Sequence, residues 1–325
     1  MAERPAGELR FDPLTREWVD VVGHRQGRPN LPTDACPFCP GGLEAPEPYD
    51  VAWFENRWPA LAPGAPLDLP VAEAAGIVSL PAVGACEVVL FSPEHDQSLA
   101  TLGRAGVRAV VDLWAARTAA LLTREEIEYV LVFENRGRAV GATIDHPHGQ
   151  IYGYPFVPPV PAQEAAVARA HGCAVCLELR AETAAASRVV FDGDGWVAWV
   201  PYASGQPFGV RAAPRAHVGT LDALDAAGRD GLAAALVDVL GRYDRLWTGD
   251  PGATTPFPYL LWFHQAPSGG GTEHHVHFHL APPERAPGIL RYVASGELGS
   301  GTLSNPVLPE AAAAALRRAS HGARA

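Results

Sequence analysis

The sequence contains no lysine, and its only methionine is Met1. All 25 basic residues are therefore arginine. A Walker-type phosphate-binding loop needs a lysine, and Schiff-base chemistry needs a lysine amine, so both are excluded. Lysyl-nucleotide intermediates are excluded for the same reason. A covalent nucleophile in this chain must come from histidine, cysteine, serine, threonine, tyrosine or a carboxylate.

The sequence also has no excess of basic residues, and it has no long apolar run. Its formal charge of −11 at pH 7 argues against a general nucleic-acid or membrane-surface binder, because either partner favours a basic face. A small phosphorylated ligand held by a few arginines is compatible with that charge. Residues 1–10 are charged, and no run is long enough to span a bilayer. We therefore expect a cytoplasmic protein with no nucleic-acid or membrane partner.

Cysteine is scarce, and most of it occurs in two Cys-x-x-Cys pairs. The first pair is Cys36 and Cys39, the second is Cys173 and Cys176, and Cys86 stands alone. In a reducing compartment such pairs hold metal more often than they form disulfides. No further pair follows the first at zinc-finger spacing, so its other ligands must be distant in the sequence. A redox pair is the alternative, but no helix pattern starts at Cys36, as a thioredoxin-like site requires.

The two halves of the chain show a weak repeat. With 325 residues and 48% hydrophobic side chains, the chain has room for one large domain or two of ordinary size. Each half contains a Cys-x-x-Cys pair, a buried strand, an amphipathic helix and an apolar strand that leads into histidines. These strands and helices are predicted at 84–91, 103–122 and 128–133, and again at 208–217, 224–243 and 259–264. We expect an α+β fold of two halves, 1–160 and 161–325.

The histidines of the first half lie in the segment 145–150, Asp-His-Pro-His-Gly-Gln. We expect His146 and His148 to point to opposite faces of this segment. Histidine is the commonest metal ligand and titrates near neutrality, so such a pair can supply one ligand and one nucleophile or base. The alternative is a pair of polar surface residues beside a turn.

The histidines of the second half alternate with apolar residues. This pattern predicts that His275, His277 and His279 share one face of a strand. With His264 upstream they indicate a metal site, because three neutral imidazoles would otherwise need separate partners. A carboxylate is expected as a further ligand for iron or zinc, and Glu164 is a candidate. The alternative is a histidine-rich edge that faces solvent.

Together these motifs resemble the galactose-1-phosphate uridylyltransferase family, the transferase branch of the histidine triad superfamily. The resemblance covers about 12–298, and its most specific parts are 133–137, Phe-Glu-Asn-Arg-Gly, and 146–150, His-Pro-His-Gly-Gln. It implies two histidine-triad-like halves, each an antiparallel sheet with helices packed on it, joined into one pseudo-duplicated unit. Gln150 stands where hydrolytic relatives have histidine, which favours transfer over hydrolysis.

The resemblance implies exchange of UMP between UDP-glucose and galactose 1-phosphate. His148 would attack the α-phosphorus, and a hexose 1-phosphate would then attack the uridylyl-histidine, which gives ping-pong kinetics. The other ring nitrogen of His148 would donate to a backbone carbonyl of the same loop. Gln150 would hydrogen-bond the phosphate oxygens. One alternative is a related phosphorylase or adenylyltransferase acting on ADP-glucose or another sugar 1-phosphate; another is a zinc-stabilised nucleotide-binding protein without catalysis.

The resemblance also implies metal ligands, substrate contacts and an assembly. Zinc would be held by Cys36, Cys39, His95 and His146. A second metal, iron or zinc, would be held by Glu164, His264, His277 and His279. Substrate would be contacted by Arg25, Arg28, Asn56, Asn135, Thr143 and Glu297. The chain would form a homodimer in which Arg25 and Arg28 reach the site of the partner subunit.

Some positions depart from the family pattern, and others have no role in it. Thr143 replaces the family's usual serine. In the sugar-binding segment, 291–298, Gly296 stands at the tyrosine position, so the sequence does not define the hexose. The second cysteine pair has no role in the resemblance, and it is expected to bind metal only if His171 or His217 joins it.

Overall fold

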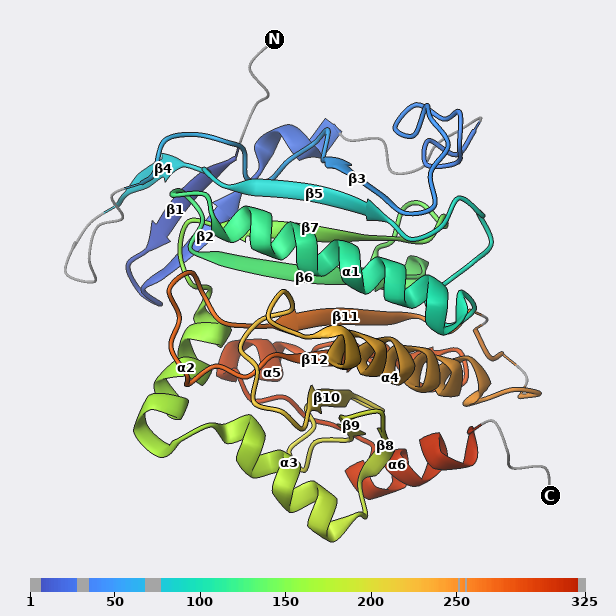
Figure 1. Ribbon diagram of the computed structural model, residues 1–325. Coiled ribbons are helices and arrows are strands. Elements are labelled where there is room, and N and C mark those ends of the chain that lie inside the picture. Colours follow the sequence, from blue (N-terminus) through green and yellow to red (C-terminus); the bar gives the residue numbers. More distant parts are fainter. Residues whose placement is uncertain (1–6, 28–34, 68–76, 251, 255, 321–325) are drawn as a thin grey trace.

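The computed structural model describes residues 7–27, 35–67, 77–250, 252–254 and 256–320 (Figure 1). Within these residues the centre is a nine-stranded sheet of order β3-β5-β7-β6-β11-β12-β10-β9-β8. Every neighbouring pair of its strands is antiparallel. The predicted α+β class with antiparallel sheets is therefore confirmed.

Both halves of the chain contribute to this sheet. The strands of the first half are β3 (Ala52–Glu55), β5 (Ala85–Leu90), β6 (Tyr129–Arg136) and β7 (His148–Tyr154). Those of the second half are β8 (Val189–Gly193), β9 (Trp196–Trp199), β10 (Val210–Pro214), β11 (Tyr259–His264) and β12 (His277–Ala281). β6 pairs with β11 at the centre, and the strand order on one side of this pair mirrors the order on the other. The weak repeat is thus a pseudo-duplication of the whole half.

Two long helices, α1 (Gly103–Leu122) and α4 (Ala226–Arg245), lie side by side on one face of the sheet (Figure 1). α1 has the predicted bounds. Its buried side chains follow the i, i+3, i+4, i+7 spacing of a helix with one apolar face, at Val107, Val110, Val111 and Trp114. The Trp114 ring packs against Phe91, from the first half, and against Phe263, from the second, at centroid distances of 5.7 and 5.4 Å. One apolar core therefore serves both halves.

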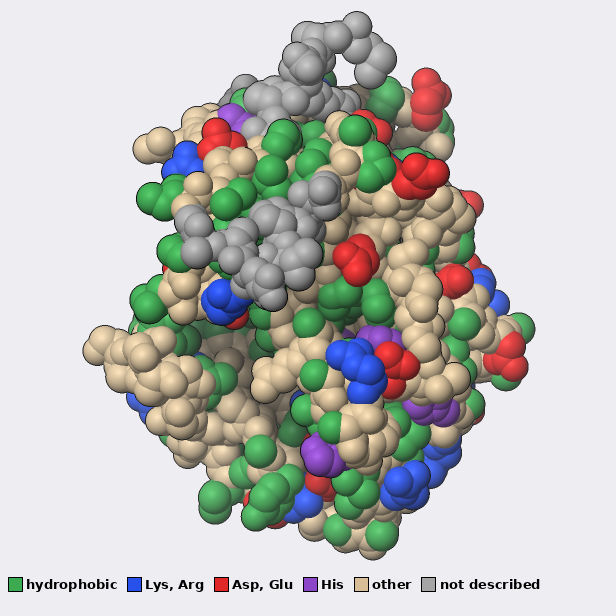
Figure 2. Space-filling model, turned by 90° about the vertical axis from the view of Figure 1, so that its left-hand side faces the viewer, with side chains coloured by type: hydrophobic (Ala, Val, Ile, Leu, Met, Phe, Trp, Pro, Cys, Tyr) green, Lys and Arg blue, Asp and Glu red, His purple; other side chains and the backbone are tan. Residues whose placement is uncertain are grey.

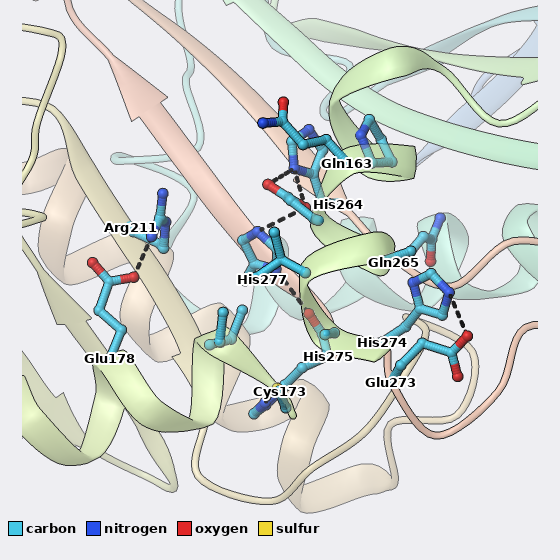
Figure 3. Close-up of a pocket in the computed structure, with 17 residues that line it drawn as sticks. Gln163, Cys173, Glu178, Arg211, His264, Gln265, Glu273, His274, His275 and His277 are labelled. Carbon is cyan, nitrogen blue, oxygen red and sulfur yellow. Dashed lines mark hydrogen bonds and ion pairs between the residues drawn. The ribbon is translucent and has the colours of Figure 1, made fainter. Parts of the chain in front are cut away.

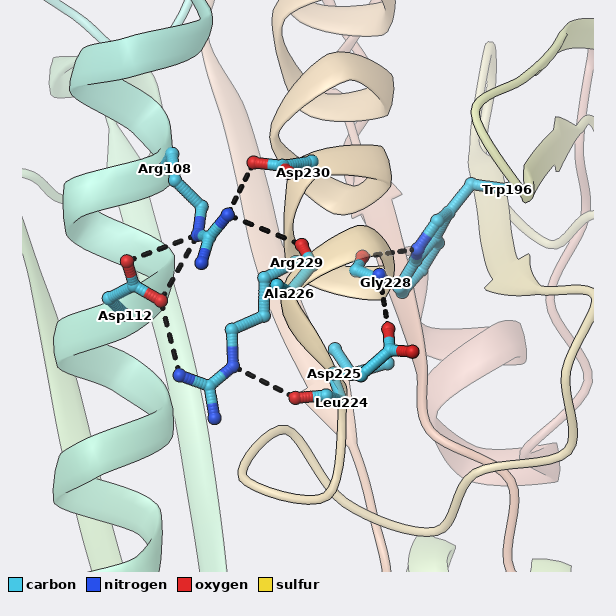
Figure 4. Close-up of polar contacts among 9 residues, drawn as sticks. All are labelled: Arg108, Asp112, Trp196, Leu224, Asp225, Ala226, Gly228, Arg229 and Asp230. Atoms are coloured by element: carbon cyan, nitrogen blue, oxygen red, sulfur yellow. Dashed lines mark hydrogen bonds and ion pairs between the residues drawn. The ribbon is translucent and has the colours of Figure 1, made fainter.

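Ion pairs join α1 to α4 (Figure 4). Arg108 of α1 pairs with Asp112 on its own helix and with Asp230 of α4. Arg229 of α4 donates to the Asp112 carboxylate over 3.1 Å. Each pair is partly exposed and contributes little alone. As a network, the pairs position the two helices against each other.

α4 begins two positions later than the sequence predicted, and its cap explains the shift. The Asp225 carboxylate accepts a 2.7 Å hydrogen bond from the backbone N–H of Gly228, so Asp225 is the N-cap and the first helical residue is Ala226 (Figure 4). The apolar Leu224, which the prediction counted in the helix, lies before this cap.

The opposite face of the sheet carries the histidines. Phe278 belongs to the core under the helices, so its neighbours His277 and His279 point to the opposite face. In the first half, Gln150 and His148 pair with Val88 and Leu90, whose side chains form a separate cluster on that opposite face. The alternation predicted from sequence is confirmed for His277, Phe278 and His279.

The remaining elements surround the large sheet. They include a three-stranded sheet of β1 (Glu8–Asp12), β2 (Glu17–Val21) and β4 (Ser79–Pro81), and the 3₁₀ helices η1 (Gly23–Gly27) and η2 (Arg138–Val140). The others are α2 (Pro159–His171), α3 (Ala174–Ala185), β13 (Glu284–Ala286), β14 (Ile289–Leu290), α5 (Ser295–Ser300) and α6 (Pro309–Arg318). None of the described helices combines the length and apolarity needed to cross a membrane. Acidic and basic side chains are interspersed on the face shown in Figure 2, so it carries no broad field of one sign.

Candidate active site and metal centres

His148 is the first residue of β7, and its ring is oriented by the loop before it. The Nδ1 atom lies 2.7 Å from the backbone carbonyl oxygen of His146. A carbonyl oxygen only accepts, so Nδ1 carries the proton and Nε2 carries the lone pair. The ring of Phe38 contacts the imidazole edge at a centroid distance of 5.0 Å. The predicted hydrogen bond from the second ring nitrogen is confirmed, and the arrangement presents Nε2 as a nucleophile.

Gly149 keeps the strand close to its neighbours. A Cβ atom at this position would lie 2.7 Å from the ring of Phe91 and 2.9 Å from the carbonyl oxygen of Phe133. Both contacts are too short for any side chain, so only glycine allows β7 to pack here. The next residue is Gln150, whose Oε1 atom accepts a hydrogen bond of 3.4 Å from Asn56 Nδ2. Its amide N–H groups are thereby oriented away from Asn56.

His148 lines three cavities: one of about 690 Å³, which Asn135 and His146 also line, and two smaller ones. One of the smaller cavities, of about 440 Å³, has a largely apolar wall that includes Phe38, Phe54 and Val88. The other, of about 230 Å³, is lined by polar groups that include Arg25 and Asn135. Both smaller cavities are lined by the side chains of Thr143, His148 and Gln150. The apolar cavity suits a planar base, the polar one suits phosphate or sugar groups, and the His148 imidazole lines both.

Most of the substrate contacts expected from sequence line these cavities. Asn56 lines the apolar cavity, and Arg25 and Asn135 line the polar one. Arg25 lies in the cavity of its own chain, where its guanidinium donates to the Tyr152 hydroxyl over 3.4 Å, although the sequence analysis assigned it to the partner's site. Arg28 lies outside the described residues.

Glu297 has a different environment from the other predicted substrate contacts. It lies in α5, and its carboxylate accepts hydrogen bonds from the backbone N–H groups of Ala294, over 2.9 Å, and Ser304, over 2.7 Å. It also pairs with Arg291. The two backbone hydrogen bonds lower the pKa of the carboxyl. These contacts hold the segment 291–304 together, and a role in substrate binding stays a prediction.

The first metal-binding group is assembled as the resemblance implies. The ligand atoms of Cys36, Cys39, His95 and His146 lie within 4.8 Å of one another. The Cys39 Sγ atom is 3.5 Å from Nδ1 of His95 and 3.5 Å from Nδ1 of His146. His146 Nε2 lies 2.8 Å from the Ser92 carbonyl oxygen and donates to it, which leaves the Nδ1 lone pair directed at the thiols. Burial lowers the pKa of His146, which favours the neutral, ligating imidazole.

The tight turn after Cys39 explains the Cys-Pro-Gly-Gly sequence. A Cβ atom on Gly42 would lie 2.7 Å from the carbonyl oxygen of Cys36 and 2.8 Å from that of Cys39. Two cysteines and two histidines form a closed set of four donors, which fits a structural zinc site. His146 thus faces the cysteines while His148 faces the cavities, so the two rings diverge as expected. Strand alternation is not the cause, because it places residues i and i+2 on the same face; the rings diverge because β7 begins only at His148 and His146 lies in the loop before it.

The second metal-binding group also comes together. Glu164 of α2, His264 of β11, and His277 and His279 of β12 place their ligand atoms within 4.8 Å of one another. His264 Nδ1 is 3.0 Å from a Glu164 oxygen, and His277 Nε2 is 3.7 Å from the other (Figure 3). The Nε2 atom of His279 is buried and has no hydrogen-bond partner among the described residues. A divalent ion such as iron or zinc fits this donor set and would supply the missing partner.

The charges of this second group match metal binding. Burial alone would raise the pKa of Glu164, but hydrogen bonds from His264 and His277 outweigh it and hold the pKa below its usual value. Burial lowers the pKa of His264 and of His279. The group therefore combines one carboxylate with neutral imidazoles at His264 and His279, as a divalent ion requires.

The prediction that His275 shares a face with His277 and His279 is wrong. β12 begins only at His277, and the preceding chain is turned by a 2.7 Å hydrogen bond from the Val276 N–H to the Val218 carbonyl. The His275 ring instead points at the second cysteine pair, with Nδ1 3.3 Å from Cys176 Sγ. The internal repeat could have predicted this orientation, because His275 corresponds to His146, the histidine that faces the cysteine pair of the first half.

The duplicated sheet, the histidine that lines the cavities and the nearby cysteine–histidine group define a transferase of the histidine triad superfamily. The family model "Galactose-1-phosphate uridyl transferase, N-terminal domain" matches residues 2–158, and the corresponding C-terminal model matches residues 167–322. The chain belongs to the galactose-1-phosphate uridyl transferase family. The division at 160 and 161 stays a prediction, since the sheet is continuous across the two halves.

Individual relatives match along nearly the whole chain. A galactose-1-phosphate uridylyltransferase from Thermotoga maritima is 36% identical over 321 residues, which cover 95% of this chain and 98% of the relative. A solved uridylyltransferase structure superimposes with a TM-score of 0.83 at 30% identity, covering 96% of this chain and 98% of that one. An ADP-glucose phosphorylase from Arabidopsis thaliana superimposes with a TM-score of 0.70 at 25% identity, covering 95% and 98%.

Proposed function

We propose that this protein transfers UMP between UDP-glucose and galactose 1-phosphate through a uridylyl group on His148. The observation that carries the proposal is the orientation of His148, with Nδ1 held by the His146 carbonyl and the ring lining an apolar and a polar cavity. Family membership supports the choice of substrates.

The reaction has two steps at His148. Nε2 attacks the α-phosphorus of UDP-glucose, the bond to the glucose 1-phosphate oxygen breaks, and an N–P bond forms. The oxygen of galactose 1-phosphate then attacks the same phosphorus and releases His148. During the first step the ring gains positive charge, and the His146 carbonyl stabilises it through the proton on Nδ1. Ping-pong kinetics follow from this scheme.

Gln150 and the cavity residues have supporting roles in the scheme. The Gln150 amide nitrogen donates to a non-bridging phosphate oxygen, since its Oε1 atom already accepts from Asn56. The uracil base occupies the apolar cavity beside Phe38, and Arg25, Asn135 and Thr143 contact the phosphates and sugars. Because Gln150 is not a base, it does not activate water.

We assign zinc to the first metal-binding group, where four protein ligands leave no open position, so the ion holds the loop rather than taking part in the reaction. We assign iron or a second zinc to the group that contains Glu164. We also propose a homodimer, with Arg25 serving its own chain. A cytoplasmic location stays a prediction from sequence.

Labelling with sugar nucleotides tests the function. The protein is incubated separately with UDP-glucose and ADP-glucose labelled on the α-phosphate, and the acid-labile, base-stable phosphoramidate is trapped. We expect label from UDP-glucose on the wild type and none on His148→Gly. Label from ADP-glucose alone would support the phosphorylase alternative, and the absence of label from both would overturn covalent transfer. Equilibrium binding of UDP-glucose to His148→Gly separates loss of chemistry from loss of binding.

A further inference from the structure

The second cysteine pair meets two histidines from other parts of the chain. Cys173 and Cys176 lie at the start of α3, His217 follows β10, and His275 precedes β12. All four ligand atoms lie within 4.8 Å of one another. Figure 3 shows Cys173 and His275 near each other at the edge of the cavity that His277 also lines. The uridylyl-transfer scheme gives none of these four side chains a role.

The separations fit a tetrahedral ion. Cys176 Sγ is 3.2 Å from Nδ1 of His217 and 3.3 Å from Nδ1 of His275, and Cys173 Sγ is 3.7 Å from the latter atom. Zinc binds sulfur at about 2.3 Å and imidazole nitrogen at about 2.0 Å, so the sulfur–nitrogen edges of a tetrahedral site measure roughly 3.5 Å. The four donors therefore already lie near the corners of a zinc tetrahedron.

The outer ring nitrogens fix both histidines in the ligating tautomer. His217 Nε2 lies 2.8 Å from the Thr272 carbonyl oxygen, and His275 Nε2 lies 2.9 Å from the Pro214 carbonyl oxygen. Both Nε2 atoms must carry a proton to donate to these carbonyls. Both Nδ1 lone pairs consequently face the sulfur atoms, which is the arrangement that metal-binding histidines adopt.

The first metal-binding group has the same construction. There too the Nδ1 atoms face a cysteine, and His146 Nε2 donates to a backbone carbonyl, that of Ser92. The residue two positions later repeats the pattern as well, because His148 Nδ1 donates to the His146 carbonyl over 2.7 Å and His277 Nδ1 donates to the His275 carbonyl over 2.8 Å.

We propose that Cys173, Cys176, His217 and His275 bind a structural zinc ion, additional to the metals of the other two groups. The ion joins the start of α3 to the loop after β10 and to the segment that enters β12. It thereby anchors α3, which packs on Val197, Trp199 and Ala213 of the sheet. This proposal does not depend on the reaction that the protein catalyses.

A redox-active disulfide is the competing role for the pair. Cys173 caps α3, and its sulfur accepts from the Cys176 N–H over 3.3 Å, which is a feature that redox pairs share. A disulfide would remove both thiolates. The Nδ1 lone pairs of His217 and His275 would then face sulfur atoms that neither donate a hydrogen bond nor share a metal ion with them. The convergence of four donors favours the ion.

Metal counting on the full-length protein tests the proposal. Protein purified without added metal is desalted, and its zinc and iron are measured per chain by mass spectrometry. We expect three ions per chain in the wild type. Cys176→Ser should lose one zinc, and Cys86→Ser, which alters a buried cysteine outside all three groups, should lose none. A zinc content per chain that is the same in Cys176→Ser as in the wild type would overturn the proposal.

A second measurement does not depend on a folded variant. Cobalt replaces zinc in the wild type, and the thiolate-to-cobalt absorption is titrated with a mercurial reagent. Two sites of two cysteines each should release their cobalt over four thiol equivalents, whereas one such site would release it over two. Mass spectrometry after thiol blocking in denaturant without reductant should find Cys173 and Cys176 both modified, and a disulfide between them in fresh protein would contradict the zinc assignment.

Discussion

His148 and His277 have the same backbone environment and different neighbours. Each donates from Nδ1 to the carbonyl two residues earlier. His148 then lines two cavities beside Gln150, whereas His277 Nε2 faces the carboxylate of Glu164. The residue two positions further along also differs, being Gln150 in one half and His279 in the other. The different roles that we propose for the two histidines, nucleophile and metal ligand, thus follow from their neighbouring side chains.

Gln150→Glu should lower the rate of uridylyl transfer by about 100-fold to 1,000-fold, because the substitution replaces an amide donor with a carboxylate that repels phosphate. Asn56→Ala should have a smaller effect of the same sign, since it removes the contact that orients Gln150. Single-turnover labelling by UDP-glucose measures both rates.

Gln163→Glu is the matched control for that experiment. Gln163 lines the separate cavity near the second metal-binding group, and the same chemical change there should leave the labelling rate unaltered (Figure 3). A wild-type rate in Gln150→Glu would show that this amide does not contact the transferred group.

Glu134 gives the protein a pH-dependent stability. Burial raises its pKa to about 7, although Arg136 and a 2.9 Å hydrogen bond from the Tyr259 hydroxyl oppose the shift. The folded state therefore retains a proton that the unfolded state releases near pH 4.5. The resulting stabilisation is complete below about pH 4.5 and is lost as the pH rises through about 7, with a total on the order of 3 kcal/mol.

The variant Glu134→Gln should remove this dependence. We expect the free energy of unfolding of the wild type to fall relative to that of Glu134→Gln between pH 5 and pH 8, roughly by the amount that linkage gives. Urea denaturation at a series of pH values measures the difference. Parallel curves for the two proteins would mean that Glu134 titrates normally in the folded state.

At the scale of the elements, hydrophobic periodicity was sufficient to predict a helix or strand where one face of that element is buried. α1 was predicted with its observed bounds, because its apolar residues follow a helical period without interruption. α2 and α3 were not predicted. α2 begins at Pro159, and the nearby prolines suggest a loop, although the first turn of a helix tolerates proline. α3 begins directly after Cys173, which the sequence presents as a possible ligand rather than as a helix cap.

The start of α4 depends on its cap. Asp225→Ala should reduce the free energy of unfolding by about 1 kcal/mol, because it leaves the Gly228 N–H without its carboxylate acceptor. Asp225→Asn retains a side-chain oxygen at the same position and should cost much less. Chemical denaturation of the three proteins in parallel makes the comparison, and equal losses for both variants would assign the effect to charge rather than to capping.

At the scale of the whole molecule, the metal-binding groups limited what the sequence could predict. The resemblance named the first two ligand sets, and both are assembled as named. To predict the third ligand set, one must know that the chain turns before His277, because this turn directs His275 away from the face that His277 and His279 share. A period-two pattern predicts which side chains share a face only within a strand. Where the strand begins is set by tertiary hydrogen bonds, which the pattern does not contain.

The predicted homodimer has a candidate interface in the segment before and within α5. The side chains of Tyr292, Val293 and Leu298 are exposed, with 78%, 52% and 81% of their surfaces accessible. Apolar groups collected on one segment are typical of a surface that contacts another chain. Leu298→Glu should therefore shift the protein from dimer to monomer in analytical ultracentrifugation, and Leu14→Glu, at a similarly exposed residue of a different loop, should not. A monomeric wild type would contradict the prediction.

The antiparallel pairing of β6 with β11 has an evolutionary consequence. Two equivalent strands that pair at the centre of a mirrored strand order have the form of a symmetric subunit interface. End-to-end fusion of the two subunits of an ancestral dimer would produce this arrangement. Such a fusion would release one of the two copies from selection for turnover, and it would leave the ring of His277, no longer required as a nucleophile, available to bind metal.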